Sequence, residues 1–515
     1  MTRFTPLLPP ATRGDDPLAS DGAVATRPPR GNALPVLAGG PLRHVVVIGG
    51  GIAGLAAAYR LTRLDPPVAV TLIEAEQRLG GKILTEQMDG FTIEGGPDSF
   101  LSVKPRGVGL CAELGLVDSL QGTTPRPHRA FVRRGDRLHE LPEGLTGLVP
   151  TRLGPILRSG LLSPWGKARF VADAVLPASR DERDESLAHF VRRRLGREVY
   201  ARLVEPLMAG IYAGDGEQLS LTATFPRLRE GERAHGGLIR GVLASRAAAS
   251  RADGAPSLPP FVTPSTGLGT LVDALARELR TAHVKIALGT LVDAVERGAS
   301  SGSDRYQVQL ATGDAIGADG IVVAVPAFAA AALLAGFEAD LATALDAIPH
   351  ASSAIVSLAY PESDIPRALD AHGYVIPRVE GRAALACTWT SAKWRGRAPD
   401  GMALIRVFLG RFGQEPLLAD DDALVATARA ELQETLGVAV SPALTRVHRW
   451  PNGMPQYTMG HLDRLATIER SLAGDPAIAL AGAAYRGVGI PDCIESGEAA
   501  AVRVHAWSAR LASRA

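Results

Sequence analysis

HVVVIGGGIAGLAAAYRL, residues 44–61, decides the fold of the first part of this chain. It passes from β-branched residues through glycines to an alanine- and leucine-rich pattern, which predicts a strand, a tight turn and a helix. Gly49, Gly51 and Gly54 take the G-x-G-x-x-G positions. The first glycine permits the turn, the second lets backbone approach a pyrophosphate, and the third lets helix pack on strand. The helix N-terminus would then face the phosphates.

A second strand supports a dinucleotide site. VAVTLIEA, residues 68–75, carries Glu74 about 20 residues after the last glycine, where an acid can bind a ribose. A glycine turn without a ligand is the less favoured alternative. The following segment, residues 76–100, adds a second glycine pair beside Lys82, which nicotinamide enzymes do not need.

Composition limits the remaining possibilities. With 515 residues, 46% of them apolar and 21% charged, the chain is long enough for two or three globular domains. Its net charge of +1 excludes a global field that would attract nucleic acid. The three cysteines lie far apart, so we expect neither a disulfide framework nor a metal site, and we expect a reducing, cytoplasmic setting. The apolar run at 328–337 is about half of a membrane span, which leaves only peripheral membrane contact open.

The alternation of strand and helix patterns predicts an α/β fold in which the chain leaves a Rossmann-like dinucleotide domain and returns to it twice. We expect an inserted helical domain and an α+β substrate domain between these visits. The expected segments are a disordered tail (1–42), dinucleotide domain parts one to three (43–108, 261–337 and 474–515), the helical insertion (109–215), a connection (216–260) and the substrate domain (338–473).

Several further landmarks follow one another along the chain. They are IEGGPDSFL (93–101), EPLMAGIYAGD (205–215), STGLGTL (265–271), ACTWTSAKW (386–394), MPQYTMGH (454–461) and GVGIPDCIESG (487–497). With them, residues 44–501 resemble the soluble bacterial branch of the protoporphyrinogen/coproporphyrinogen III oxidases. These are FAD enzymes of the flavin amine oxidase superfamily that aromatise porphyrinogens in haem synthesis.

That resemblance implies FAD as the cofactor and a dinucleotide domain of the amine oxidase type. The positions that it implies as FAD contacts are Gly49, Gly50, Gly51, Ile52, Ala53, Gly54, Glu74, Ala75, Lys82, Gly96, Pro97, Asp98, Ser99, Val292, Trp450, Gly489, Ile490 and Pro491. In the last landmark we expect glycine backbone to approach the flavin ring and Pro491 to begin a helix. We also expect the carboxylates of Asp492 and Glu495 to point away from the ring.

The activity implied by the resemblance is oxidation of coproporphyrinogen III by O2, which removes six electrons and yields three H2O2. No second G-x-G-x-x-G is visible for a nicotinamide donor, which favours O2 as the acceptor. The alternatives are protoporphyrinogen IX as the substrate, a flavin amine oxidase, a carotenoid-type desaturase and a flavoprotein without catalytic activity. A ferrochelatase is a possible recipient of the product.

The substrate's propionates need cations, and the candidates are Lys104, Arg106 and Arg406. The alternative is a surface position that serves solubility, which is favoured for the two arginines. Lys104 also falls where the resemblance places a cation near the mouth of the site. No catalytic residue is assigned. His461, Tyr212 and Asp98 are candidates for proton transfer by their place in the landmarks, but a structural role is favoured for each.

Overall fold

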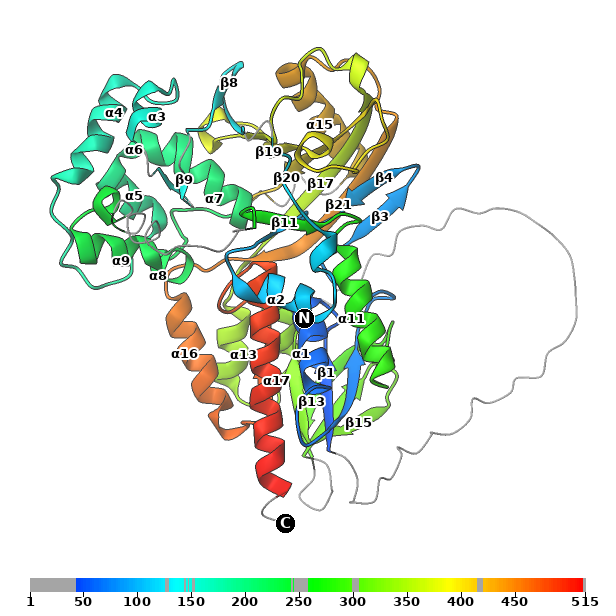
Figure 1. The fold of residues 1–515 in the computed structure, drawn as a ribbon. Helices are drawn as coiled ribbons and strands as arrows, with labels where there is room; N and C mark the ends of the chain where they lie inside the picture. Colours follow the sequence, from blue (N-terminus) through cyan, green and yellow to red (C-terminus); the bar gives the residue numbers. More distant parts are fainter. Residues whose placement is uncertain are drawn as a thin grey trace, which may run out of the picture. The chain divides into compact units, whose positions relative to one another are not determined.

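A five-stranded parallel sheet forms the centre of the dinucleotide-binding part in the computed structural model (Figure 1). The strands run in the order β12 (Lys285–Ala287), β2 (Ala69–Ile73), β1 (His44–Ile48), β16 (Gly320–Val323) and β22 (Ile478–Leu480). The first and last of these strands along the chain both pair with β16, so the chain leaves this sheet and returns to it.

The structure describes residues 43–512, except 126–128, 143–144, 147, 151–152, 242–243, 245–257, 299–304 and 415–419. The tail expected at residues 1–42 lies outside them.

Alternation along β1 divides its side chains between two apolar layers. Val45 and Val47 enter one layer, and Val46 and Ile48 enter the other. Helices on the first face are α1 (Ile52–Leu61), α2 (Pro105–Glu113), α11 (Gly269–Thr281) and α17 (Ile490–Ala512). The second face is covered by α12 (Ala327–Leu333), α13 (Ala339–Asp346), α16 (His461–Ser471), and a meander of β13 (Val292–Arg297), β14 (Tyr306–Leu310) and β15 (Ala315–Ala318).

A second, seven-stranded sheet carries Arg406, one of the three expected substrate cations, and Trp450. Its order is β21 (Leu444–Pro455), β17 (His350–Pro361), β20 (Met402–Leu409), β19 (Ala384–Trp389), β18 (Gly373–Val375), β7 (Phe131–Arg134) and β8 (Arg137–Glu140). All neighbours are antiparallel except β18 and β7. Helix α15 (Asp421–Leu436) packs its apolar side against this sheet.

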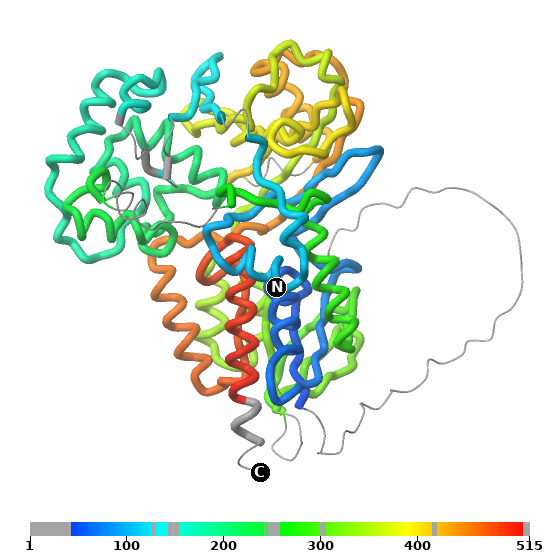
Figure 2. Tube along the Cα trace, viewed as in Figure 1, coloured from blue at the N-terminus to red at the C-terminus, as the bar shows by residue number. Residues whose placement is uncertain are grey.

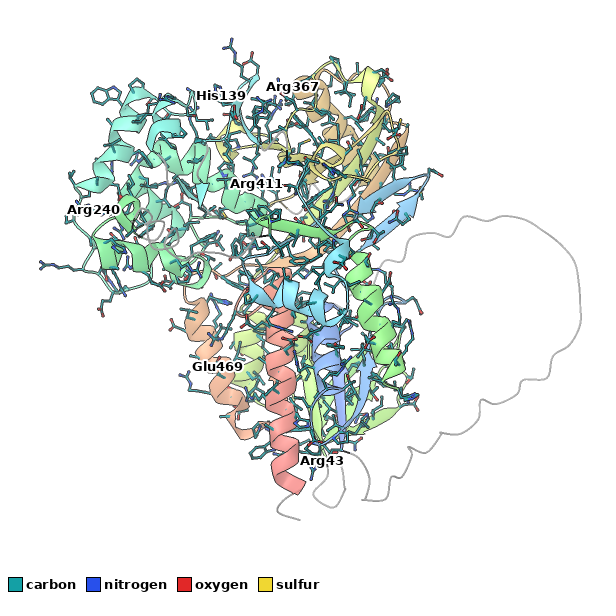
Figure 3. All side chains as sticks on the ribbon, viewed as in Figure 1. Arg43, His139, Arg240, Arg367, Arg411 and Glu469 are labelled. Atoms are coloured by element: carbon teal, nitrogen blue, oxygen red, sulfur yellow. The ribbon has the colours of Figure 1, made fainter. Side chains whose placement is uncertain are left out.

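The helical part occupies residues 153–241 and has an apolar core of its own. Its helices are α3 (Leu153–Arg158), α4 (Pro164–Val171), α5 (Leu187–Leu195), α6 (Arg197–Val199), α7 (Glu205–Tyr212), α8 (Leu221–Thr224) and α9 (Pro226–His235), with a π-helical turn at Tyr200–Val204. Arg411, labelled in Figure 3, joins this part to the second sheet: it donates to Glu205 Oε1 at 2.6 Å and to the Ile376 carbonyl at 2.7 Å.

Short elements link these parts. They are the hairpin β3 (Thr85–Met88) and β4 (Phe91–Glu94), the three-stranded sheet of β5 (Phe100–Leu101), β11 (Phe261–Pro264) and β6 (Leu120–Gly122), the pair β9 (Leu145–Thr146) and β10 (Val149–Pro150), and helix α14 (Thr390–Lys393).

The observed boundaries differ from the expected ones in two places. The helical insertion does not fill 109–215, because β6, β7 and β8 lie inside that range, and the helical part continues through α9. The substrate segment 338–473 begins with α13 and ends with α16, and both pack on the dinucleotide-binding sheet. In each case the partner element lies far away in sequence, which short-range patterns do not report.

Candidate functional site

The glycine turn between β1 and α1 has the backbone that only glycine accepts readily. Gly49 has a φ of +106°, and a Cβ there would lie 2.6 Å from the Ala324 carbonyl oxygen. A Cβ on Gly54 would lie 1.9 Å from the Gly49 carbonyl oxygen. Helix α1 starts at Ile52, and no described side chain caps it and no acid lies in its first turn. Its first amides are therefore left for an anionic ligand.

Glu74, directly after β2, reaches back to this turn. Its Oε2 accepts a hydrogen bond from the Gly50 amide at 2.6 Å, and its Oε1 accepts one from the Glu76 amide at 2.8 Å. Ala75 beside it is exposed. A half-buried carboxylate at this position suits a ribose, as the spacing predicts.

The second glycine pair lies against the first. The Gly80 amide donates to the Gly50 carbonyl at 2.8 Å, and Gly51 and Gly80 form an isolated parallel bridge. Lys82 follows; its side chain retains exposed surface, yet the surrounding protein lowers its pKa by desolvation. Lys82 also lies close enough to lower the pKa of His350, on β17.

The loop after β4 is held by side chains of the second sheet. The carbonyl of Gly95 accepts a hydrogen bond from Trp450 Nε1 at 2.7 Å, and that of Gly96 accepts one from Arg406. A Cβ on Gly96 would lie 1.9 Å from the Lys82 carbonyl oxygen, so this position requires glycine. The predicted contacts Gly96 to Ser99 and Trp450 therefore come together through β20 and β21.

Asp98 is the centre of a buried polar cluster. Its carboxylate accepts from Ser99 Oγ at 2.8 Å, from Lys393 Nζ at 2.9 Å and from Trp394 Nε1 at 3.1 Å, and it lies 3.5 Å from Arg406. Burial alone would raise the pKa of Asp98, but Lys393 and Arg406 hold it well below its usual range. The carboxylate stays charged and fully engaged, which argues against its role in proton transfer.

Near the C-terminus, the glycine run ends at the first turn of α17, which begins at Ile490 as Pro491 led us to expect. Asp492 Oδ2 accepts from the Gly489 amide at 3.1 Å, and Lys104 Nζ lies 2.6 Å from both oxygens of the same carboxylate. Asp492 thus folds back onto the glycine run with its charge paired by Lys104. Its direction relative to a flavin ring stays a prediction. Glu495 is exposed.

The two helix N-termini are brought together by a small residue. A Cβ on Gly497 of α17 would lie 2.0 Å from the Ala53 carbonyl oxygen of α1, so only glycine permits this crossing. In Figure 2 the red helix α17 runs beside the blue helix α1. The two halves of the predicted cofactor site, Gly49–Gly54 and Gly489–Pro491, therefore stand at the starts of two helices that pack against each other. Val292, at the start of β13, is 7% exposed and stays a predicted adenine contact.

Two of the three predicted substrate cations are committed to the protein itself. Arg406 is 1% exposed and bound to Gly96 and Asp98. Arg106 donates to Glu498 and Glu113 and so fastens α2 to α17. The sequence could not show these partners, and both contacts argue against a substrate role. Lys104, whose side chain is 43% exposed, is the remaining candidate of the three.

The other two candidates for proton transfer, His461 and Tyr212, are buried inside the protein. His461 is fully buried, its Nε2 contacts the Tyr485 carbonyl at 2.9 Å, and burial lowers its pKa to about 4. Tyr212 is buried, which raises its pKa well above the ordinary value. Sequence reasoning missed the roles of Lys393 and Trp394 around Asp98, although both stand in the ACTWTSAKW landmark. Within the described part of the chain, no three His, Cys, Asp or Glu side chains form a metal-binding group.

Comparison with known proteins now decides the family. Residues 52–505 match the family described as flavin containing amine oxidoreductase. The chain belongs to this family, in its porphyrinogen oxidase branch. It is 39% identical over 466 residues to the coproporphyrinogen III oxidase of Bacillus subtilis strain 168, a match that covers 89% of this chain and 97% of that protein. The Staphylococcus aureus protein of the same name is 34% identical, with 90% and 99% covered.

Solved structures agree on the fold. The crystal structure of a putative protoporphyrinogen oxidase from Exiguobacterium sp. 255-15 has a TM-score of 0.78 and 31% identity, and covers 91% of this chain and 99% of that one. Cyclohexylamine oxidase from Brevibacterium oxydans shares the fold alone, with a TM-score of 0.64 at 18% identity. The family is flavin-dependent, and the glycine turn with its uncapped helix end suits FAD. The predicted FAD cofactor, oxidoreductase class and amine oxidase-type fold are thus confirmed.

Proposed function

We propose that this protein is an FAD-dependent oxidase that converts coproporphyrinogen III to coproporphyrin III with O2. The observation that carries the proposal is similarity over nearly the whole chain to bacterial proteins named coproporphyrinogen III oxidase. It is supported by the uncapped N-terminal turn of α1 and by α17, which packs closely on α1 at Gly497.

When bound, FAD accepts two electrons at a time, so removing six electrons takes three oxidations and, with O2 as acceptor, releases three H2O2. The protein's own part is binding and orientation. The turn at Gly49–Gly54 and the α1 amides would hold the pyrophosphate, and Glu74 would hold the ribose. The loop at Gly96–Ser99 and the first turn of α17 would flank the ring. We assign no side chain as a general base.

A cation near the mouth of the site would select for carboxylates. Coproporphyrinogen carries four propionates and protoporphyrinogen two, and Lys104 is the candidate that would meet one of them. A propionate would have to compete with Asp492, which holds the ammonium group now. Replacing Lys104 should therefore affect KM for the substrate more than FAD binding.

Protoporphyrinogen IX is the second candidate substrate. A protoporphyrinogen oxidase from Bos taurus is 33% identical over 487 residues, a match that covers 90% of this chain and 98% of that protein. The amine oxidase alternative rests on fold likeness only. We place the reaction in the cytoplasm, because all three cysteines are free and buried. Within the described residues no helix is long and apolar enough to cross a bilayer. Transfer of the product to a ferrochelatase stays a prediction.

The test is direct. The purified holoprotein receives coproporphyrinogen III and protoporphyrinogen IX separately in air, while porphyrin fluorescence and H2O2 are followed. We expect fluorescence to rise with coproporphyrinogen, with three H2O2 formed per porphyrin. A Gly54→Val variant serves as the control, because its side chain closes the turn and should remove FAD and activity together. Bound flavin without oxidation of either porphyrinogen would refute the proposal, and a preference for protoporphyrinogen would change only the substrate.

A further inference from the structure

Tyr457 and His461 contact the backbone of residues 483–487, the segment that leads into α17. Their rings stack with centroids 4.1 Å apart and planes within 13° of parallel. We propose that they act as a positioning pair, which fixes the backbone of residues 483–487 and so sets where the first turn of α17 meets the flavin. The inference rests on the flavin placement proposed above.

The pair holds three backbone groups within five residues. Tyr457 Oη donates to the Ala483 carbonyl at 2.6 Å and accepts from the Gly487 amide at 2.8 Å. His461 Nε2 contacts the Tyr485 carbonyl at 2.9 Å. A hydroxyl both donates and accepts, so tyrosine can hold a carbonyl and an amide at once.

The protonation state of His461 follows from its surroundings. Burial lowers its pKa to about 4, and Arg464 and Arg486 act in the same direction, although the Tyr485 carbonyl opposes them. The ring is therefore neutral at pH 7. Since Nε2 faces a carbonyl, the single proton belongs on Nε2, where it donates. Nδ1 is buried without a hydrogen-bond partner among the described residues.

The held segment needs such support because its own residues allow wide backbone freedom. Gly482 and Gly487 adopt φ values of +117° and +151°, which side chains rarely permit. The Gly487 backbone leads within two residues to Gly489, the start of the proposed ring contact. The hydrogen bond from the Gly487 amide to Tyr457 Oη therefore helps to fix the position of Gly489.

Tyr457 also connects this segment to the helical part. Its backbone carbonyl accepts from the Ser220 amide at 2.8 Å, and its ring meets that of Tyr212 edge-on with centroids 6.0 Å apart. The ring is buried among the side chains of the helical core. Tyr457 is therefore anchored in the helical part, whereas His461 begins α16, which packs on the dinucleotide-binding sheet. The pair thus links these two parts beside the segment that leads into α17.

The experiment compares Tyr457→Phe, His461→Ala and His461→Gln in the full-length holoprotein. Tyr306→Phe is the matched control, because it also removes a buried hydroxyl. That hydroxyl bonds Arg305 and Asp475 in the meander, and Arg305 faces Trp507 near the end of α17 opposite its first turn. The readouts are the FAD dissociation constant, the visible flavin spectrum and the flavin midpoint potential. These readouts do not require turnover.

We expect Tyr457→Phe and His461→Ala to raise the FAD dissociation constant about ten-fold, the scale of one or two lost hydrogen bonds. The flavin spectrum should shift and the midpoint potential should become more negative, since the positive end of α17 is displaced. His461→Gln, whose amide can donate to the Tyr485 carbonyl, should recover most of the loss. Tyr306→Phe should leave all three readouts at the wild-type values.

Wild-type FAD affinity, spectrum and potential in Tyr457→Phe would overturn the positioning role. So would equal losses in His461→Gln and His461→Ala, because packing alone would then explain them. Failure of the wild-type holoprotein to oxidise porphyrinogens would defeat the proposed function instead, and the flavin readouts would still decide on the positioning pair.

Discussion

Replacing Gly497 with alanine should push apart α1 and α17, the two helices that carry the halves of the proposed cofactor site. The added Cβ would lie 2.0 Å from the Ala53 carbonyl oxygen and 2.9 Å from its carbonyl carbon. Ordinary contact begins at 3.4 Å, so the gap must open by about 1.4 Å. Both atoms belong to helix backbone, which cannot rotate away as a side chain would.

The added methyl group should lower the free energy of unfolding, because it overpacks a tight helix crossing. Inserting one methyl group into a tight interior destabilises by about 1–3 kcal/mol, and we expect the upper half of that range. For a unit of this length the melting entropy is on the order of 1 kcal/mol per kelvin, so the thermal midpoint should fall by about 2–3 °C. FAD binding should be weakened more, because α17 would move from its proposed position beside the ring; we expect the dissociation constant to rise at least ten-fold.

The assay is a thermal melt with and without added FAD, together with titration of the apoprotein by FAD. Gly210→Ala is the matched control. Gly210 lies exposed in α7 with no atom within 4 Å of an added Cβ, so the same substitution there should stabilise by about 0.5–1 kcal/mol through helix propensity. Wild-type melting and FAD affinity in Gly497→Ala would refute the argument that this crossing requires glycine.

Three further predictions concern the buried titratable groups. Asp98→Asn should lower the free energy of unfolding by about 3–5 kcal/mol because it removes the buried carboxylate that pairs with both Lys393 and Arg406; an unchanged melt would contradict this. Stability should decline as pH falls from about 6.5 to 4, since burial lowers the pKa of His461 and His350 to about 4 and protonation then favours the unfolded chain. His461→Gln should flatten that decline, and an identical pH profile would count against the assignment. Cys493, whose pKa burial raises to about 12, should resist thiol reagents at pH 8 in the folded holoprotein and react only on unfolding; rapid labelling without unfolding would show that the thiol is accessible.

Local sequence patterns were sufficient to predict the strands and helices that form the glycine turn and position Glu74. The strand, turn and helix at residues 44–61 and the strand ending before Glu74 lie where the sequence predicts them. Pro491 stands in the first turn of α17, also as expected. In these cases the requirement is local, because β-branched residues, positive φ values and a missing amide act within a few residues.

Local patterns failed where the partner of a residue lies far along the chain. The sequence predicted that Arg406 and Arg106 are free cations. In the structure they are paired with Asp98 and Glu498, which come from distant segments of the chain. For His461 the sequence favoured a structural role but could not show which one; its ring is stacked on a tyrosine and contacts a backbone carbonyl. Charge alone therefore identified residue types but not their roles.

By itself the sequence determined the dinucleotide turn, the acid that follows it and, through its landmarks, the family. Only the tertiary structure decided which cation is exposed, which carboxylates are neutralised and where α17 packs on α1. The physical reason is that pairing and burial depend on the position of every neighbour. The crossing at Gly497 shows this: its need for glycine comes from the carbonyl of Ala53, on another helix far earlier in the chain.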